Sequence, residues 1–150
     1  MVIFINGSIN SGKSTIAKLL GNKLGNTAIL EIDRFHEFLE WMSIGEIIPI
    51  NLKNAVSLIK NYVEFGFNVV MPYPLSQKNY EYLMNNLKDL KTKISIFTLA
   101  PKLEKVLTNR GNRELDGLEI SRIKYHYEIG IPNPKFGEII DNTDQTPEET

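Results

Sequence analysis

The chain has 150 residues, a formal net charge of −1 and 42% hydrophobic residues. These values are typical of one globular domain, and we expect a single domain over residues 1–150. The near-neutral charge gives no sign of a nucleic-acid partner, and no apolar run in the sequence approaches the length of a membrane span. The sequence has no cysteine, which excludes disulfides, thiolate metal sites and a cysteine nucleophile, and we expect a cytoplasmic protein.

Short strand-like runs alternate with longer stretches of helical periodicity along the chain. The pattern predicts strands at 2–6, 28–32, 67–71, 94–100 and 137–140. It predicts helices at 13–24, 34–42, 52–65, 76–91, 101–110 and 117–129. This alternation favours a parallel α/β sheet covered on both faces, with ligands bound at the carboxyl ends of the strands.

The end of the sequence carries helix-start chemistry. Residues 146–149, Thr-Pro-Glu-Glu, supply a cap residue, a proline at the first helical position and a glutamate three residues after the cap. Because the sequence stops at Thr150, we expect a shortened C-terminal helix; a single frayed turn is the alternative.

The most specific motif is GSINSGKS, from Gly7 to Ser14, which matches G-x-x-x-x-G-K-[ST] between a predicted strand and a predicted helix. Its glycines let backbone N–H groups curl around phosphates, and the following helix adds its positive end. Lys13 would reach the β- and γ-phosphates, and the Ser14 hydroxyl would bind Mg²⁺. The motif therefore predicts a nucleoside triphosphate site made of Gly7, Asn10, Ser11, Gly12, Lys13, Ser14 and Thr15.

Candidate acceptor-side residues follow the second and third predicted strands. Asp33 ends the second strand, so it would lie near the phosphate loop. There its carboxylate would either accept the proton of a substrate hydroxyl or hold a water on Mg²⁺. Capping the next helix is a compatible alternative. Arg34 either clamps an anionic group of the acceptor or is a solvated helix-start residue. Trp41 either lines an acceptor pocket or packs on the core, whereas Tyr73, at the end of the third strand, would form part of a rigid wall on the acceptor side.

Two of the four arginines, Arg110 and Arg113, fall in a polar segment that contains glycine. Phosphoryl transfer needs cations on the transferred group and a loop that excludes water. We therefore expect a lid at about residues 110–117; a solvent-exposed basic loop is the alternative.

The phosphate loop, Asp33, the arginine-bearing segment and the Ile-Asp-Asn-Thr run at 140–143 together resemble the small P-loop kinases. That group includes shikimate and gluconate kinases, chloramphenicol phosphotransferase and the tunicamycin-resistance ATP-binding proteins. The resemblance implies a three-layer P-loop NTPase fold with a five-stranded parallel sheet in the order 2-3-1-4-5. It also implies that Arg110, Asn142 and Thr143 hold adenine, that Arg113 touches the transferred phosphate, and that Asp33 is the base or orients the acceptor.

The acceptor side departs from shikimate kinases. Phe35 stands where they have a second aspartate, no arginine lies between residues 35 and 109, and Pro72-Tyr73-Pro74 replaces a glycine-rich loop. A site for the shikimate carboxylate is therefore poorly supported. The segment at 69–74, Val-Val-Met-Pro-Tyr-Pro, looks closer to the tunicamycin-resistance type.

The sequence thus predicts a phosphotransferase that moves the γ-phosphate of Mg²⁺·ATP to a hydroxyl of a small-molecule metabolite or antibiotic. Lys13, Asp33 and Arg113 would be catalytic, and Ser14 and Asp33 would serve the metal. One alternative is a nucleotide kinase of the same fold. Another is a non-catalytic ATP-binding protein that sequesters a ligand, favoured by the lack of an acidic residue after the third strand. No nucleic-acid or membrane partner is expected, and the oligomeric state stays open.

Overall fold

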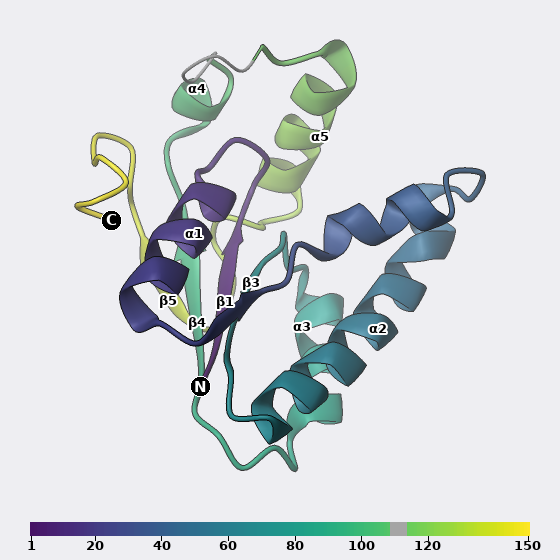
Figure 1. The fold of residues 1–150 in the computed structure, drawn as a ribbon. Coiled ribbons are helices and arrows are strands. Elements are labelled where there is room, and N and C mark those ends of the chain that lie inside the picture. Colours follow the sequence, from purple (N-terminus) through teal and green to yellow (C-terminus); the bar gives the residue numbers. More distant parts are fainter. Residues whose placement is uncertain (109–113) are drawn as a thin grey trace.

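The computed structural model describes residues 1–108 and 114–150, and in it a parallel sheet of five strands runs through the middle (Figure 1). The strand order is 2-3-1-4-5, which confirms the predicted fold class and order. β1 lies at the centre and pairs in parallel with β3 on one side and β4 on the other. The strands are β1 Val2–Gly7, β2 Thr27–Ile29, β3 Asn68–Pro72, β4 Ile94–Leu99 and β5 Glu138–Ile140.

Helices cover both faces of this sheet. Figure 1 shows α1 on one side and α2 with α3 on the other, while α4 and α5 lie near the loop that joins β1 to α1. The helices are α1 Lys13–Leu24, α2 Ile44–Glu64, α3 Gln77–Leu87, α4 Leu103–Val106 and α5 Gly117–Glu128, and a 3₁₀ helix, η1, spans Ile32–Phe38. None of the helices in the described residues is long and apolar enough to cross a membrane.

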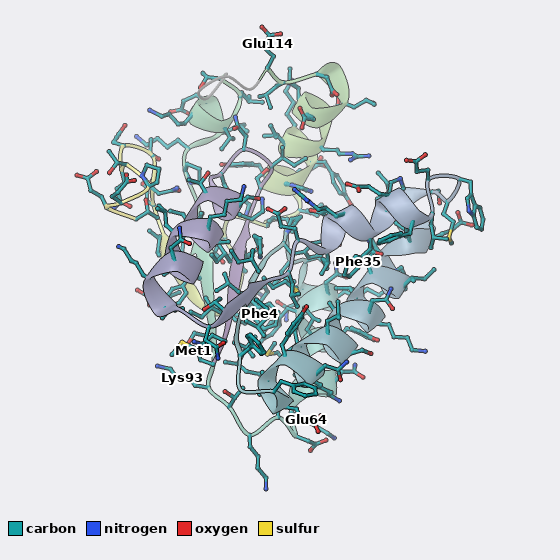
Figure 2. All side chains as sticks on the ribbon, viewed as in Figure 1. Met1, Phe4, Phe35, Glu64, Lys93 and Glu114 are labelled. Atoms are coloured by element: carbon teal, nitrogen blue, oxygen red, sulfur yellow. The ribbon has the colours of Figure 1, made fainter. Side chains whose placement is uncertain are left out.

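Alternating side chains of β1 divide the core into two layers. Val2 and Phe4 are fully buried in the layer that contains α2 and α3, where Figure 2 labels Phe4. Ile3 and Ile5 face the other way and pack with Ala17 of α1. Because β1 is covered on both faces, its sequence is apolar at every one of its first residues rather than at alternate ones.

The helix α2 begins at Ile44, eight residues before the predicted start at 52, so that boundary was wrong. Ser43 and Glu46 form a capping box, in which the Ser43 backbone N–H donates to Glu46 Oε2 over 3.2 Å. This cap starts the helix ahead of Pro49, which lies inside it. Proline breaks a helix chiefly by clashing with the preceding turn and removing one bond, and a well-capped first turn with a packed apolar face offsets that cost.

Other boundaries also differ from the predictions. Residues 34–42 do not form an α-helix, since η1 ends at Phe38. Helical structure stops at Leu87 rather than at 91, and α4 occupies four residues of the predicted 101–110 segment. Thr146 and Glu149 bond reciprocally, with the Thr146 N–H donating to Glu149 Oε2 over 2.8 Å, but the segment forms a turn and not an α-helix.

Candidate nucleotide and acceptor site

The loop between β1 and α1 curls tightly because it uses backbone conformations that favour glycine. Gly7 and Gly12 have φ values of +143° and +99°, and Asn10 adopts +63°. A Cβ on Gly7 would lie 2.6 Å from Ser11 Oγ and 2.7 Å from the Leu99 carbonyl oxygen, too close for any side chain. Glycine at position 7 therefore lets the loop fold back against the end of β4.

Side chains from distant parts of the chain hold this loop in place. Asn10 Nδ2 donates to the carbonyl oxygens of Val106 and Thr108 over 2.9 and 3.0 Å. From the other side, Asn142 Nδ2 donates to the Ser11 carbonyl oxygen over 3.0 Å. The loop is thus tied both to α4 and to the segment after β5.

The loop and the start of α1 are suited to an anion. The first turn of α1 contains no acidic residue, and no side chain caps it at Gly12. The first N–H groups of any α-helix lack partners within the helix, so those of Ser14 and Thr15 can serve an outside acceptor. Lys13 adds a positive charge, and its Nζ donates to the Ser8 carbonyl oxygen over 2.7 Å. A polyanion would offer this ammonium group stronger acceptors than one carbonyl oxygen.

A cavity of about 680 Å³ opens over this loop, and we call it the loop cavity. It brings together most of the predicted nucleotide residues with both candidate residues that follow β2. Among the predicted residues its lining comprises Asn10, Gly12, Lys13, Ser14, Thr15, Asp33, Arg34 and Asn142. Gly7 and Ser11 shape the loop beneath it, and Ser11 is fully buried.

Some predicted residues lie elsewhere. Trp41 is 80% exposed and is not in the lining of the loop cavity or of the second cavity described below. The Thr143 hydroxyl accepts from the Lys102 N–H over 2.9 Å and bonds to Asp141, so its contacts are with neighbouring chain. Arg110 and Arg113 lie outside the described residues.

Arg34 is paired with an acidic neighbour. Its Nε lies 3.0 Å from Glu31 Oε2 in an ion pair three residues apart, and its side chain is 71% exposed. Such an exposed pair contributes little stability, so an anionic ligand in the loop cavity could still compete for the guanidinium group.

Asp33 lines the loop cavity and also a second one, and its carboxyl group is tuned by its surroundings. Although the side chain remains in contact with solvent, partial desolvation by the protein raises the pKa of Asp33 above the ordinary carboxyl value. The positive charge of Lys13 opposes this shift, Glu31 adds to it, and Arg122 opposes it. A raised pKa makes a carboxylate a stronger base near neutral pH.

The second cavity has a volume of about 900 Å³ and lies between η1, α2, α5 and the connection from β3 to α3. Its most buried lining residues are Ile47, Asn51, Leu52, Tyr73 and Ile131. Tyr73 is 4% exposed, and burial together with the nearby charge of Asp33 raises its pKa, so the phenol stays protonated at neutral pH. Tyr73 therefore lines the second cavity.

His126 of α5 was missed by the sequence reasoning. Its Nδ1 lies 3.3 Å from the hydroxyl of Ser8 in the phosphate loop, and it lines the second cavity. Burial lowers the pKa of His126 to about 4, and the charges of Lys13 and Arg122 act in the same direction. The imidazole is therefore neutral at pH 7. Nothing in the sequence marks this histidine, because it stands alone in an ordinary helical segment.

Asn6 was also missed, and it braces the backbone next to the second cavity. It is fully buried at the end of β1. Its Nδ2 donates to Thr98 Oγ1 over 3.0 Å and to the Ile131 carbonyl oxygen over 3.1 Å. Its Oδ1 accepts from the Leu75 N–H over 2.7 Å. One side chain thus joins β1 to β4 and to two segments that line the second cavity or lie next to it.

Comparisons with known proteins connect this architecture to kinases through structure alone. No family model and no curated protein matches the sequence. A sugar kinase from Janibacter sp. aligns with a TM-score of 0.73 and 16% identity over 98% of this chain and 87% of its own. The tunicamycin resistance protein of Deinococcus radiodurans aligns with a TM-score of 0.69 and 19% identity over 98% of this chain and 88% of its own. A gluconokinase from Sinorhizobium meliloti aligns with a TM-score of 0.70 and 15% identity over 99% of this chain and 85% of its own. The chain therefore has the fold of the small P-loop kinases.

Proposed function

We propose that the protein is an ATP-dependent phosphotransferase that moves the γ-phosphate of Mg²⁺·ATP to a hydroxyl group of a small molecule. The observation that carries this proposal is the position of Asp33. Its side chain lines both the loop cavity and the second cavity. A carboxylate at the junction of an anion site and an acceptor site is placed to activate a hydroxyl group next to a phosphoryl donor.

The loop cavity is the proposed donor side. The phosphates would bind to the N–H groups at the start of α1 and to Lys13, and Asn142 would contribute to the adenine end, together with Arg110 and Thr143 as the family resemblance implies. Mg²⁺ prefers oxygen ligands and keeps several waters, so one or two protein oxygens suffice. The Ser14 hydroxyl and the Asp33 carboxylate are oxygen donors of this kind in the lining. When bound, the ion neutralises charge on the phosphates.

The acceptor hydroxyl would sit beside Asp33 at the boundary of the two cavities. Asp33 accepts its proton as the oxygen attacks the γ-phosphorus, and the ADP oxygen leaves on the opposite side. Lys13 stabilises charge on the transferred group, and Arg113 is proposed to do the same from the segment outside the described residues. Neutral His126, in contact with Ser8, keeps the loop free of a further positive charge beside Lys13.

Proteins of this fold include a sugar kinase and a gluconokinase, whose names describe phosphorylation of small hydroxylated compounds. This likeness favours an alcohol acceptor over a nucleic-acid or protein one. At such low sequence identity the likeness supports the class of reaction only. The identity of the acceptor has to be argued from the residues that line the cavity.

The direct test incubates the protein with Mg²⁺ and γ-labelled ATP and a panel of hydroxylated small compounds. We expect transfer of label to at least one compound, with ADP released in step. ADP release that no compound accelerates, together with unlabelled compounds throughout, would refute the kinase proposal. GTP run in parallel measures base preference.

A second candidate function is favoured by the end of β3. Pro72 and Tyr73 stand there with no acidic side chain, at a position where kinases and ATPases often present one for the metal. The protein would then bind ATP and retain a ligand in the second cavity without transferring phosphate. Equilibrium binding of a compound that ATP enhances, without labelled product, would identify this function.

A further inference from the structure

We infer that the second cavity accepts an uncharged, largely apolar hydroxylated compound that is held by the Asn51 carboxamide. The inference deepens the proposed function and rests on it for one point, that the compound presents its reacting hydroxyl to Asp33. It follows from the size of the cavity, the distribution of charge on its walls and one buried polar group.

The size and the walls suit a mostly apolar ligand of drug-like dimensions. The volume of about 900 Å³ lies within the roughly 300–1,000 Å³ usual for small-molecule sites. Isoleucine and leucine side chains from two regions of the chain form much of the apolar lining: Ile44, Ile47, Ile48, Leu52, Ile129 and Ile131. Burial of an apolar scaffold against them is the largest source of affinity that this cavity offers.

Charge is confined to the edges of the cavity. In the described part of the chain, its charged lining residues are Asp33, Lys78 and Arg122, and all of them are exposed. The stretch of α2 in the lining, residues 44–52, contributes no charged side chain to it. A carboxylate or phosphate pushed against this helix would lose its hydration without gaining a cation, which is strongly unfavourable. An acceptor whose anionic group would contact α2 is therefore disfavoured.

Asn51 supplies a specific polar contact in this apolar wall. It belongs to α2, is 4% exposed and lines the cavity. Its Oδ1 is buried and has no hydrogen-bond partner among the described residues. Buried polar groups in folded proteins are nearly always paired, so an unpaired one in a cavity wall points to a partner that a ligand supplies. The half-buried His36, also in the lining, has a second such atom, Nδ1. Donors such as an amide N–H or a hydroxyl fit both atoms.

Matched probes test the charge preference. Isothermal titration and ligand-observed NMR would compare a panel of pairs that differ in one group, for example phenyl β-glucoside with phenyl β-glucuronide, in the absence of ATP. We expect the uncharged member of the binding pairs to bind at least about tenfold more tightly, because burying an unpaired charge is costly. Equal or tighter binding of the anionic members overturns the inference, and so does the absence of any uncharged binder at millimolar concentration.

Substitution of Asn51 tests the polar contact, using the tightest probe of the panel. Asn51→Leu keeps the shape and removes the amide, and we expect its affinity to fall at least about tenfold because the ligand donor is left unpaired. The melting temperature should stay equal or rise, since an unpaired buried group has been removed. Asn54→Leu, on the same helix at an exposed position, is the matched control and should leave affinity within about twofold.

The combination of outcomes separates this inference from the proposed function. Unchanged affinity with lower stability in Asn51→Leu overturns the inference and makes Asn51 structural. Asn51→Ala repeats the test should the leucine variant not fold. Binding that depends on Asn51, with no compound of either panel labelled by γ-labelled ATP and none accelerating ADP release, refutes the kinase proposal and leaves the ligand class standing. Phosphorylation of an anionic acceptor supports the kinase proposal and overturns the inference about the ligand class.

Discussion

The loop cavity and the second cavity are built in different ways. Nearly half of the lining of the first comes from one short segment, residues 9–16, whose backbone conformation shapes the phosphate loop. The second is assembled from side chains of η1, α2, α3 and α5, which are far apart in the sequence. A site formed by a short stretch of backbone can be recognised in the sequence as a motif, whereas a site formed by tertiary packing cannot. The difference explains why the sequence supports a specific prediction for the loop cavity and none for the second cavity.

The largest expected effect tests the loop cavity alone. Lys13→Ala removes the cation that faces the phosphates and should lower turnover by about a thousandfold, with nucleotide binding lost or severely weakened. Lys18→Ala, on the exposed face of the same helix, is the control and should behave as wild type. Full activity in the Lys13 variant would contradict the assignment of the phosphate site.

Asp33→Asn tests the junction between the two cavities. Transfer should fall by about a hundredfold, the usual contribution of a general base, while ATP binding stays largely intact. In the wild type, kcat/KM should drop with falling pH as Asp33 of the free enzyme becomes protonated, at a pH above the ordinary carboxyl pKa of 3.8 because the pKa of Asp33 is raised. The residual activity of the variant should not show this drop at low pH. Losses of binding and rate in equal measure would make Asp33 structural.

The two loop glycines separate packing from backbone strain. Gly7→Ala combines a disfavoured φ with contacts under 3 Å, and we expect it to lower the free energy of unfolding by about 2–3 kcal/mol. At Gly12 a Cβ would lie 3.8 Å from Asn142 Nδ2, an ordinary contact, so backbone strain acts alone and we expect a loss of about 1 kcal/mol. Chemical denaturation measures both. Equal losses would show that the contact with Leu99 relaxes freely.

His126 is expected to affect stability at acidic pH; it lines the second cavity and contacts Ser8 of the phosphate loop. With a folded pKa of about 4 against 6.5 for the free side chain, the unfolded chain binds a proton between these values that the folded protein does not. The free energy of unfolding should therefore fall as the pH drops from 6.5 to 4. Because the imidazole is partly exposed, we expect about 1–2 kcal/mol of this loss to disappear in His126→Gln. Identical pH slopes in the two proteins would count against the buried, neutral histidine.

The fold was largely predictable because hydrophobic periodicity and the punctuation by glycine and proline are local signals. The five strands and the strand order agree with expectation. Errors arose where tertiary context decided: α2 starts at Ile44 and not at the predicted 52, because the Ser43 cap and the buried face of the helix stabilise it despite Pro49. Likewise Trp41, expected on a helix facing the acceptor, follows η1 on an exposed stretch because no α-helix forms there.

The site was half predictable for the same reason. The loop residues and Asp33 follow from the motif and from the rule that parallel strands end at one edge. His126 and Asn51 become visible only once α5 and α2 are folded against that edge, since neither carries a sequence signal. Arg110, Arg113 and the proposed lid remain predictions.

The hydrogen bonds of Asn6 limit how new specificities can be engineered into this scaffold. Its three partners, Leu75, Thr98 and Ile131, come from separate parts of the chain. A chimera that imports the β3–α3 connection or the segment after α5 from a relative would break one of these bonds unless the donor backbone presents the same group in register. Transplanting acceptor preference between such proteins is therefore best attempted by changing cavity-lining side chains on the resident backbone, not by exchanging whole segments.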